Sequence, residues 1–330
     1  MGQGLGMRVA VMDDWQGVAR DSTDWSALAA RAEVVFMSGA FADEDAAAAA
    51  LAGFEIVIPM RERTAFTSTL LARLPKLKLI AQTGGRAQTM DLERATASGI
   101  LVCNTMGERS SIGTAELTLG LILAAARRIP QGDAAIRAGR FQEGVGIGPV
   151  LDGLTLGIIG FGRIGARVGM FGRALGMKLL AWSPNLTAET AAAGGATLAS
   201  RDALLGGSDV ISLHVVLSAR SRHMLGAAEL ALMKPGALLV NTSRGPLVDE
   251  AALVAALNAG RIMAGLDVYD REPLPADHPI RTAANTVLTP HLGYGTTDTF
   301  RQFYRESVEN VLAFLDGAPI RMVNPGAVGR

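Results

Sequence analysis

Residues 154–165 read LTLGIIGFGRIG, and this stretch decides the fold of the chain. The apolar run 154–159 leads directly into a glycine-rich turn, and a helical pattern follows it. Strand, glycine turn and helix, in that order, form the context that the dinucleotide-binding fingerprint GxGxxG requires. Gly160 permits the tight turn, Gly162 lets a pyrophosphate approach the backbone, and Gly165 lets the helix pack close to the strand. The helix N-terminus would add unpaired N–H groups and a positive dipole end.

Short apolar runs alternate with helical patterns on both sides of this turn. Before it, we expect strands at 8–12, 34–36, 56–58, 77–81 and 100–102, with helices near 24–31, 43–52, 67–74 and 91–98. From the turn onward, we expect strands at 154–159, 178–182, 209–213, 237–241, 262–267 and 286–289. Such alternation predicts parallel sheets with helices on both faces, and six strands suit a full dinucleotide fold.

The segments between and after these strands define the domain organisation. A long helix is expected at 111–128, followed by a glycine-rich loop or arm at 137–153. The tail 296–315 has a helical pattern but no strands of its own, so it should pack back on the first lobe. We therefore expect two doubly wound parallel-sheet lobes. They are a flavodoxin-like substrate domain, 1–106 and 296–330, and a Rossmann dinucleotide-binding domain, 107–295.

Composition excludes several classes of protein. Of 330 residues, 49% are apolar and 19% are charged, which is typical of a globular protein with a large core. The formal net charge is zero and no basic block occurs, so nucleic-acid binding has little support. A single cysteine, Cys103, excludes an intrachain disulfide framework and fits a reducing compartment. Without a charged leader or a long apolar run, we expect a soluble cytoplasmic protein with no membrane partner.

The end of the second strand of the nucleotide lobe leaves the choice of cofactor open. A site selective for NAD normally carries Asp or Glu there, bonded to the ribose hydroxyls. Here strand 178–182 is followed by Ser183, Pro184 and Asn185, with no carboxylate. Ser183 and Asn185 can hydrogen-bond either NAD or NADP, or they can simply shape a turn. The candidate contacts from the glycine turn are Gly160, Phe161, Gly162, Arg163, Ile164 and Gly165.

Three further blocks make a family resemblance specific. Residues 239–250 read LVNTSRGPLVDE, residues 266–274 read LDVYDREPL, and residues 289–293 read TPHLG. Together with the glycine turn, and in this order, they resemble the signature of the D-isomer-specific 2-hydroxyacid dehydrogenases, including the phosphoglycerate dehydrogenases. The resemblance covers nearly the whole chain. It implies an NAD(P)-dependent oxidoreductase that moves a hydride between a D-2-hydroxy acid and its 2-keto acid.

The resemblance assigns a catalytic role to three residues that follow expected strands. Arg244 would bind the substrate carboxylate and polarise the keto oxygen with its planar, permanently charged fork. His291 would act as general acid in reduction and general base in oxidation. Glu272 would orient the imidazole and stabilise its protonated form. The family implies four further cofactor contacts, at His214, Thr242, Asp267 and Gly293. His214 would contribute through its backbone, and Asp267 would contact the nicotinamide amide.

The first lobe should supply further substrate contacts. Gly84, Gly85 and Arg86 follow the fourth strand, where backbone N–H groups of the family meet the substrate carboxylate. Arg61 and Arg63 follow the third strand and resemble the segment of phosphoglycerate dehydrogenases in which arginines meet a phosphate. A solvated charged loop is the alternative interpretation. Substrates of either the 3-phosphoglycerate type or the glyoxylate/hydroxypyruvate type are therefore compatible with the sequence.

The sequence also leads to expectations about assembly, metal binding and regulation. The family resemblance implies a homodimer formed through the nucleotide domain, using helix 111–128 and the arm at 137–153. No His, Cys and Asp residues occur at metal-ligand spacing, so no metal is expected. The sequence ends without an extra regulatory domain, so feedback by an amino acid through such a domain is not expected. The alternative function is a non-enzymatic NAD(P)-sensing protein, similar to a corepressor, built on the same fold.

Overall fold

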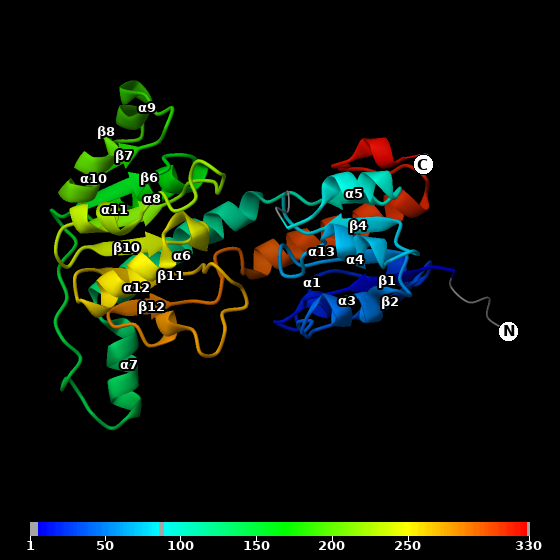
Figure 1. Ribbon diagram of the computed structural model, residues 1–330, viewed down its shortest axis with the longest axis horizontal. Coiled ribbons are helices and arrows are strands. Elements are labelled where there is room, and N and C mark those ends of the chain that lie inside the picture. The colour runs from blue at the N-terminus through cyan, green and yellow to red at the C-terminus, as the bar shows by residue number, and fades with distance from the viewer. Residues whose placement is uncertain (1–5, 86–88, 329–330) are drawn as a thin grey trace. The chain divides into compact units, whose positions relative to one another are not determined.

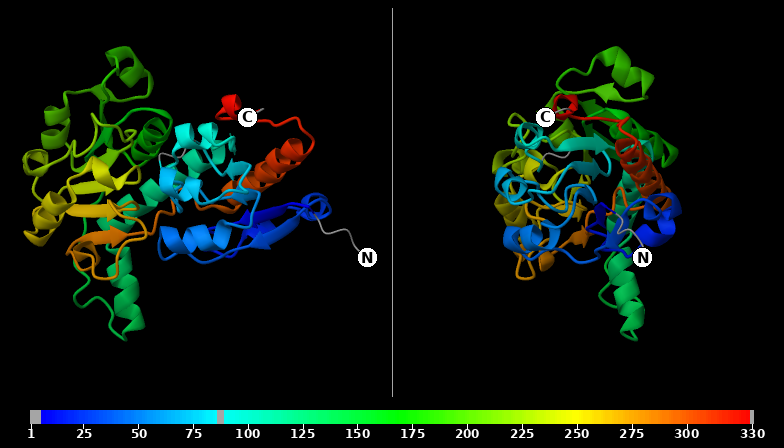
Figure 2. Two further views of the ribbon diagram at one scale, coloured as in Figure 1. Left: turned by 45° about the vertical axis from the view of Figure 1, so that its right-hand side comes forward. Right: turned by 90° about the vertical axis from the view of Figure 1, so that its right-hand side faces the viewer.

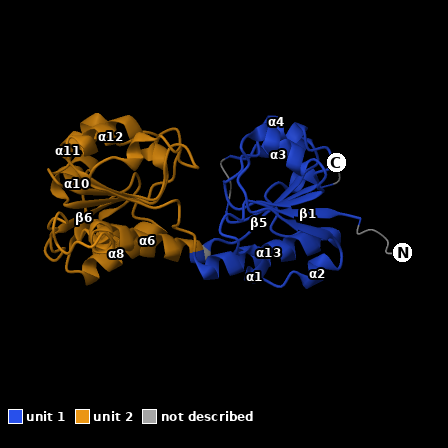
Figure 3. Ribbon diagram, turned by 90° about the horizontal axis from the view of Figure 1, so that it is seen from below, with its two compact units in different colours: residues 1–109, 296–330 blue, residues 110–295 orange. Residues whose placement is uncertain are grey.

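The structure, a computed structural model, describes residues 6–85 and 89–328, apart from the side chain of Glu108. It consists of two compact units (Figure 3). Unit 1 comprises Met1–Arg109 and Thr296–Arg330, and unit 2 comprises Ser110–Gly295. Each unit contains one parallel sheet with helices between its strands (Figure 1). This arrangement confirms the predicted α/β fold class.

Unit 1 is built on a five-stranded parallel sheet of order β2-β1-β3-β4-β5. This is the flavodoxin-like order, in which the direction of winding reverses between β1 and β3. The strands are β1 (Arg8–Val11), β2 (Glu33–Phe36), β3 (Ile56–Ile58), β4 (Leu79–Gln82) and β5 (Leu101–Asn104). The helices are α1 (Ala19–Ser22), α2 (Ser26–Ala29), α3 (Glu44–Leu51), α4 (Ser68–Ala72), α5 (Leu92–Ala97) and α13 (Thr297–Leu315), with a 3-10 turn, η3, at Pro325–Ala327.

Local sequence explains where these helices begin and what they cover. Asp43, Thr67 and Asp91 precede α3, α4 and α5, and each side chain accepts a hydrogen bond from the first turn of its helix. The tail helix α13 buries an apolar face that includes Phe300 and Phe303, and it packs against α1, β4 and β5. The helical tail therefore packs on the sheet of unit 1.

Unit 2 is built on a seven-stranded parallel sheet of order β12-β11-β10-β9-β6-β7-β8. Counted from β6 and viewed from the other end, this order is 3-2-1-4-5-6-7, the Rossmann order with one additional strand. The strands are β6 (Thr155–Ile159), β7 (Lys178–Trp182), β8 (Thr197–Leu198), β9 (Val210–Leu213), β10 (Leu238–Asn241), β11 (Met263–Leu266) and β12 (Thr286–Leu288). The helices are α6 (Glu108–Ala126), α7 (Ile129–Arg137), α8 (Arg163–Ala174), α9 (Ala188–Ala193), α10 (Arg201–Gly207), α11 (Ala227–Leu232) and α12 (Glu250–Asn258), with 3-10 turns η1 (Gly245–Leu247) and η2 (Pro279–Arg281).

Two features of unit 2 differ from the expectation. The two-residue edge strand β8 was not predicted, because both of its side chains are exposed and carry no apolar pattern. The helix expected at 111–128 begins at Glu108, ends at Ala126 and is followed by a separate helix, α7. Arg128 has a left-handed backbone with φ of 54°, and Pro130 stands in the first turn of α7, so the chain breaks and restarts there.

Helix α7 and the segment after it expose apolar side chains. Residues 138–154 form neither helix nor strand, as the glycine-rich pattern predicts. Within unit 2, α7 projects away from the sheet in both views of Figure 2. Side chains from α7 and the following arm are largely exposed, namely Ile129, Ile136, Phe141, Ile147 and Val150.

Candidate active site

The glycine turn after β6 has the geometry that the fingerprint requires. Gly160 has φ of +100°, and a Cβ placed on it would lie 2.6 Å from the carbonyl carbon of His214. Two backbone hydrogen bonds of 2.7 Å hold the turn, from Gly160 N–H to Trp182 O and from His214 N–H to Ile159 O. A side chain at position 160 would therefore be strained and would also collide with backbone that is fixed on both sides.

The other two glycines prepare the start of α8. A Cβ on Gly165 would lie 2.2 Å from Gly160 O, so only glycine lets the helix pack on the turn. At Gly162, the N-cap of α8, no heavy atom of the described chain lies within 4 Å of the corresponding Cβ position. A backbone that is open to approach, at the N-terminus of a twelve-residue helix, fits the pyrophosphate of a dinucleotide.

Some of the predicted cofactor contacts around this turn are buried or half-buried, and others are exposed. Phe161 is buried and its backbone N–H donates to Ser183 Oγ at 2.7 Å. Ser183 is therefore fixed to the glycine turn rather than free to rotate. Ile164 is half-buried and packs on the core of unit 2, whereas Arg163 and Asn185 are exposed.

His291 and Glu272 form the central pair of the candidate site. The His291 Nδ1 atom lies 2.5 Å from Glu272 Oε2, with a quarter of the histidine side chain and a third of the glutamate side chain exposed. His291 follows β12 and has a left-handed backbone with φ of 53°. Such a conformation is uncommon for a residue other than glycine and is concentrated at functional sites. Because Nδ1 faces the carboxylate, Nε2 is the ring nitrogen left for acid–base chemistry.

Asp267 holds the turn that carries His291. Its Oδ1 accepts hydrogen bonds from Thr289 Oγ1 at 2.6 Å and from Leu292 N–H at 2.7 Å, and its Oδ2 accepts one from Gly293 N–H at 2.8 Å. Its backbone oxygen accepts the His291 N–H at 2.9 Å. Burial raises the pKa of Asp267, while these hydrogen bonds act in the opposite direction. The contact between Asp267 and the nicotinamide amide stays a prediction.

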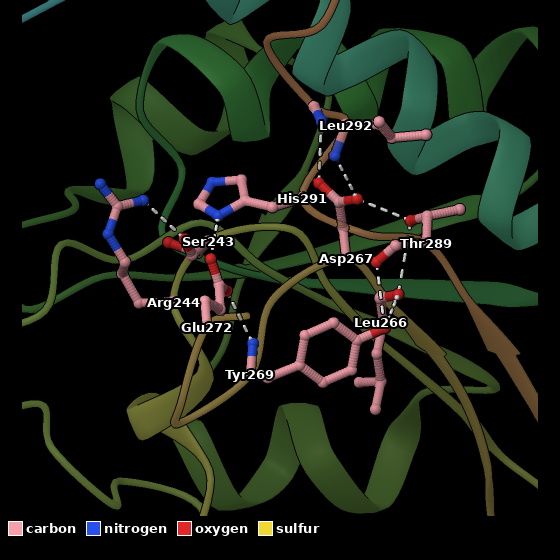
Figure 4. Close-up of polar contacts among 10 residues, drawn as sticks. Ser243, Arg244, Leu266, Asp267, Tyr269, Glu272, Thr289, His291 and Leu292 are labelled. Carbon is pink, nitrogen blue, oxygen red and sulfur yellow. Dashed lines mark hydrogen bonds and ion pairs between the residues drawn. The ribbon is translucent and has the colours of Figure 1, made fainter. Parts of the chain in front are cut away.

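Arg244 lies beside this pair, to its left in Figure 4. It occupies the turn between β10 and η1, and its Nη1 donates to Ser243 O at 2.7 Å. Asn241 Nδ2 donates to Arg244 O at 2.9 Å and Ser243 Oγ donates to Val215 O at 2.7 Å, which fixes the backbone of the turn. The unit 2 sheet therefore brings Arg244, Glu272 and His291 together at the carboxyl ends of β10, β11 and β12.

The remaining cofactor candidates of unit 2 have partners inside the unit. Thr242 Oγ1 lies 2.8 Å from Thr118 Oγ1, and Gly293 is buried against Asp267. His214 Nε2 lies 2.8 Å from Ser212 Oγ, and burial lowers the pKa of His214 to about 3. His214 is thus a neutral imidazole at ordinary pH. Its backbone, which packs on Gly160, is the part next to the glycine turn.

The substrate candidates of unit 1 follow β3 and β4. Arg61 has φ of 57°, its N–H donates to Thr83 Oγ1 at 2.8 Å, and its guanidinium lies over Gly84. The Gly84 N–H, expected to meet a carboxylate, donates to Thr105 Oγ1 at 2.7 Å, whereas Gly85 is exposed. Arg63 Nη1 donates to the backbone oxygen of Asp13 and to Gln16 Oε1. Arg86 lies outside the described residues.

Three residues that shape these sites were not among the residues predicted from the sequence. Asp13 follows β1 with φ of 61°, and its carboxyl group is buried beneath Arg63 and Thr64. Tyr269 and Thr289 support the His291 turn, although both lie inside blocks that the resemblance had already marked. The detectable signal for Asp13 was a charged pair, Asp13 and Asp14, directly after an apolar strand.

Within the described ranges, no three His, Cys, Asp or Glu side chains gather closely enough to hold a metal ion. None of the described helices combines the length and the apolar character needed to cross a bilayer.

Comparison with known proteins identifies the family. Residues 119–293 match the family model described as D-isomer specific 2-hydroxyacid dehydrogenase, NAD binding domain. The glyoxylate reductase of Aeropyrum pernix is 42% identical over 264 residues, which are 77% of this chain and 78% of that protein. The D-3-phosphoglycerate dehydrogenase of Methanocaldococcus jannaschii is 41% identical over 244 residues, 73% of this chain but only 46% of that protein. The chain thus spans about half the length of the phosphoglycerate dehydrogenase.

This chain is also similar to a solved structure. The structure of phosphoglycerate oxidoreductase from Vibrio cholerae has a TM-score of 0.90 at 35% identity, and the match covers 94% of this chain and all of that one. The chain belongs to the D-isomer-specific 2-hydroxyacid dehydrogenase family. It is accordingly an oxidoreductase with a nicotinamide dinucleotide as cofactor, and the non-enzymatic alternative is not favoured.

Proposed function

We propose that this enzyme reduces a short 2-keto acid of the glyoxylate/hydroxypyruvate type to the D-2-hydroxy acid, and catalyses the reverse oxidation. The observation that carries the proposal is the contact of 2.5 Å between His291 Nδ1 and Glu272 Oε2, beside Arg244 and in the same unit as the glycine turn. A nicotinamide dinucleotide, when bound, supplies the hydride in reduction and accepts it in oxidation. The chain's own residues must then bind the substrate carboxylate and transfer one proton.

His291, oriented by Glu272, would transfer the proton. With Nδ1 held by the carboxylate, the His291 Nε2–H would donate a proton to the keto oxygen as that oxygen becomes a hydroxyl. In oxidation, neutral Nε2 would take the same proton back. The Glu272 carboxylate, 2.5 Å from Nδ1, would hold the imidazole in one orientation.

Arg244 would bind the acid. Its guanidinium offers several N–H donors in one plane, which suits the two oxygens of a carboxylate and the neighbouring keto oxygen. The turn that carries Arg244 is fixed through Asn241 and Ser243, so the fork keeps its direction when substrate arrives. Unit 1 would act as the substrate-binding domain and unit 2 as the dinucleotide-binding domain.

The glyoxylate/hydroxypyruvate type is favoured over 3-phosphoglycerate for two reasons. The match to glyoxylate reductases extends over more than three quarters of their length, compared with about half for phosphoglycerate dehydrogenases. In addition, Arg63 Nη1 already donates to Asp13 O and Gln16 Oε1, and the Asp13 carboxyl group lies beneath it. A negative charge at this position disfavours a phosphate.

Oxidation of 3-phosphoglycerate is the second candidate. Arg61 and Arg63 follow β3 at the place where the resembling segment of phosphoglycerate dehydrogenases meets a phosphate. The experiment compares glyoxylate, hydroxypyruvate, pyruvate and phosphohydroxypyruvate as substrates, each with NADH and with NADPH. Higher kcat/KM for hydroxypyruvate than for phosphohydroxypyruvate supports the proposal, and the opposite order supports the second candidate.

We propose that the enzyme accepts both NAD and NADP with weak discrimination. Ser183 carries no charge to repel a 2′-phosphate, and its Oγ already accepts the Phe161 N–H. Ser183→Asp should shift the preference toward NADH, because a carboxylate repels the 2′-phosphate and bonds the ribose. Asn185→Asp, on an exposed neighbour, is the matched control for added charge. An unchanged NADPH preference in Ser183→Asp would remove Ser183 from the ribose site.

We propose further that the enzyme is a cytoplasmic homodimer assembled through unit 2. The exposed apolar side chains of α7 and the arm, such as Ile136 and Phe141, support this assembly. Ile136→Lys should then yield a monomer in sedimentation experiments. Met170→Lys changes an equally exposed apolar residue on α8 and should leave the dimer intact. A dimer that survives Ile136→Lys and deletion of residues 140–148 would place the interface elsewhere.

A further inference from the structure

Tyr269 contacts the segments that carry all three candidate catalytic residues. It lies three residues after the end of β11, its side chain is buried, and it occupies the lower centre of Figure 4. Its backbone N–H, its hydroxyl group and its carbonyl each face a different segment. The three contacts involve Glu272, the turn before His291, and the turn after Arg244.

The first contact fixes the carboxylate. Tyr269 N–H donates to Glu272 Oε1 at 2.9 Å, while Glu272 Oε2 faces His291 Nδ1. One carboxylate oxygen is therefore held by backbone and the other is left for the imidazole. Because the glutamate side chain is about one third exposed and has several rotatable bonds, this anchor restricts its rotation.

The second contact fixes the histidine turn. The Tyr269 hydroxyl donates to Thr289 O at 3.0 Å, two residues before His291. The same peptide region is held by Thr289 Oγ1 on Asp267 and by Thr289 N–H on Leu266 O. Burial, together with the negative charges of Asp267 and Glu272, raises the pKa of Tyr269 far above its ordinary value. The hydroxyl therefore remains a donor throughout any practical assay range.

The third contact fixes the arginine turn. A Cβ on Gly245, the residue after Arg244, would lie 2.1 Å from the Tyr269 carbonyl carbon and 2.3 Å from its oxygen. The two backbones touch directly, without a side chain between them. Any displacement of Tyr269 would consequently move the support of the Arg244 turn.

We propose that Tyr269 is a positioning residue that sets the mutual geometry of Arg244, Glu272 and His291. It would act through these residues and would not touch the substrate. The proposal rests on the proposed function, because it assumes that these three residues perform the reaction. It adds that the phenol hydroxyl, and not only the volume of the ring, serves the reaction.

The test removes the hydroxyl and retains the ring. Tyr269→Phe should lower kcat for 2-keto acid reduction roughly fivefold, the equivalent of one neutral hydrogen bond, with KM little changed. Tyr304→Phe, the same change at another buried tyrosine in unit 1, should leave both quantities at the wild-type values.

A readout that does not need turnover separates this proposal from the proposed function. Nuclear magnetic resonance of the His291 ring should show a single Nδ1–H tautomer in the wild type and in Tyr304→Phe, and a mixture in Tyr269→Phe. If the ring behaves identically in all three proteins, the positioning role is wrong even where activity is present. If no 2-keto acid is turned over but the tautomer still changes, the proposed function fails and the Tyr269 contact stands.

A second variant tests the arginine contact. Gly245→Ala inserts a methyl group against the Tyr269 carbonyl, so kcat should fall more than in Tyr269→Phe. Gly206→Ala in α10 adds a methyl group 3.6 Å from Leu232 O, an ordinary contact distance, and should retain full activity. A folded Gly245→Ala enzyme with wild-type kcat would overturn the link between Tyr269 and Arg244.

Discussion

The substitution Gly162→Ala tests whether the glycine turn binds the dinucleotide, because it should affect cofactor binding more than folding. Gly162 is the N-cap of α8, its φ is −95°, and the Cβ of an alanine would meet no described atom within 4 Å. An alanine is therefore sterically compatible with the folded chain. Its methyl group would nevertheless occupy the space through which a pyrophosphate must approach the backbone.

The two effects act on different quantities, the free energy of unfolding and the affinity for the cofactor, and can be measured separately. Replacing an N-cap glycine by alanine should lower the free energy of unfolding by roughly 1 kcal/mol. A methyl group forced into a packed contact typically costs 1–3 kcal/mol, which weakens cofactor affinity about 5- to 150-fold. Gly160→Ala should behave in the opposite way, because its φ of +100° and the His214 carbonyl carbon at 2.6 Å penalise the fold itself.

Two equilibrium assays distinguish these outcomes. Thermal unfolding followed by circular dichroism reports the fold, and titration of NADH or NADPH with fluorescence detection reports the dissociation constant. Gly206→Ala, in helix α10 of the same unit, should keep the wild-type affinity. A Gly162→Ala protein that binds both cofactors as tightly as the wild type would refute the placement of the pyrophosphate at this turn.

Three further substitutions have defined outcomes. Arg244→Lys keeps the charge but loses the planar fork. The value of kcat/KM should therefore fall by roughly 10- to 150-fold, about the worth of one charged hydrogen bond. A loss of less than about threefold would show that Arg244 does not contact the substrate. Glu272→Gln replaces the carboxylate that lies 2.5 Å from His291 Nδ1 by a neutral amide, so reductive kcat/KM should drop by at least about tenfold, the worth of one charged hydrogen bond. Wild-type kcat/KM in this variant would reduce Glu272 to a turn residue. Burial raises the pKa of Asp13 from 3.8 to about 6, so the folded state is penalised increasingly as pH rises between these values. Asp13→Asn should therefore add up to about 3 kcal/mol to the free energy of unfolding near neutral pH and little near pH 4, as measured by urea denaturation, and an equal effect at both pH values would contradict the buried carboxyl group.

The sequence predicted the strands well because buried parallel strands are short, continuous apolar runs. Strands such as β6 and β9 lie within a residue of their expected positions, since both faces of a parallel sheet are covered by helices. Strand β8 lacks this signal, because its two exposed residues pair only with β7 at the sheet edge. Its position depends on tertiary pairing and not on local pattern.

The sequence predicted that Glu272 and His291 lie close together, but it did not predict the groups that support them. Glu272 and His291 stand after strands that end at the same sheet edge, so their proximity follows from topology. The network around Asp267 was not predictable, because it depends on the left-handed backbone at His291 and on the direction of three N–H or O–H groups. Likewise, the burial of Asp13 depends on how the β1 and β3 loops fold over one another.

The most direct test of the central claim is the stereochemistry of hydroxypyruvate reduction. Purified enzyme would be incubated with hydroxypyruvate and either NADH or NADPH, and the glycerate would be resolved by chiral chromatography. The wild type should form D-glycerate, and His291→Ala should form it about 10²- to 10⁴-fold more slowly. Formation of L-glycerate, or an equal rate in His291→Ala, would contradict the assignment of this chain as a D-2-hydroxyacid dehydrogenase that uses His291 as its acid–base group.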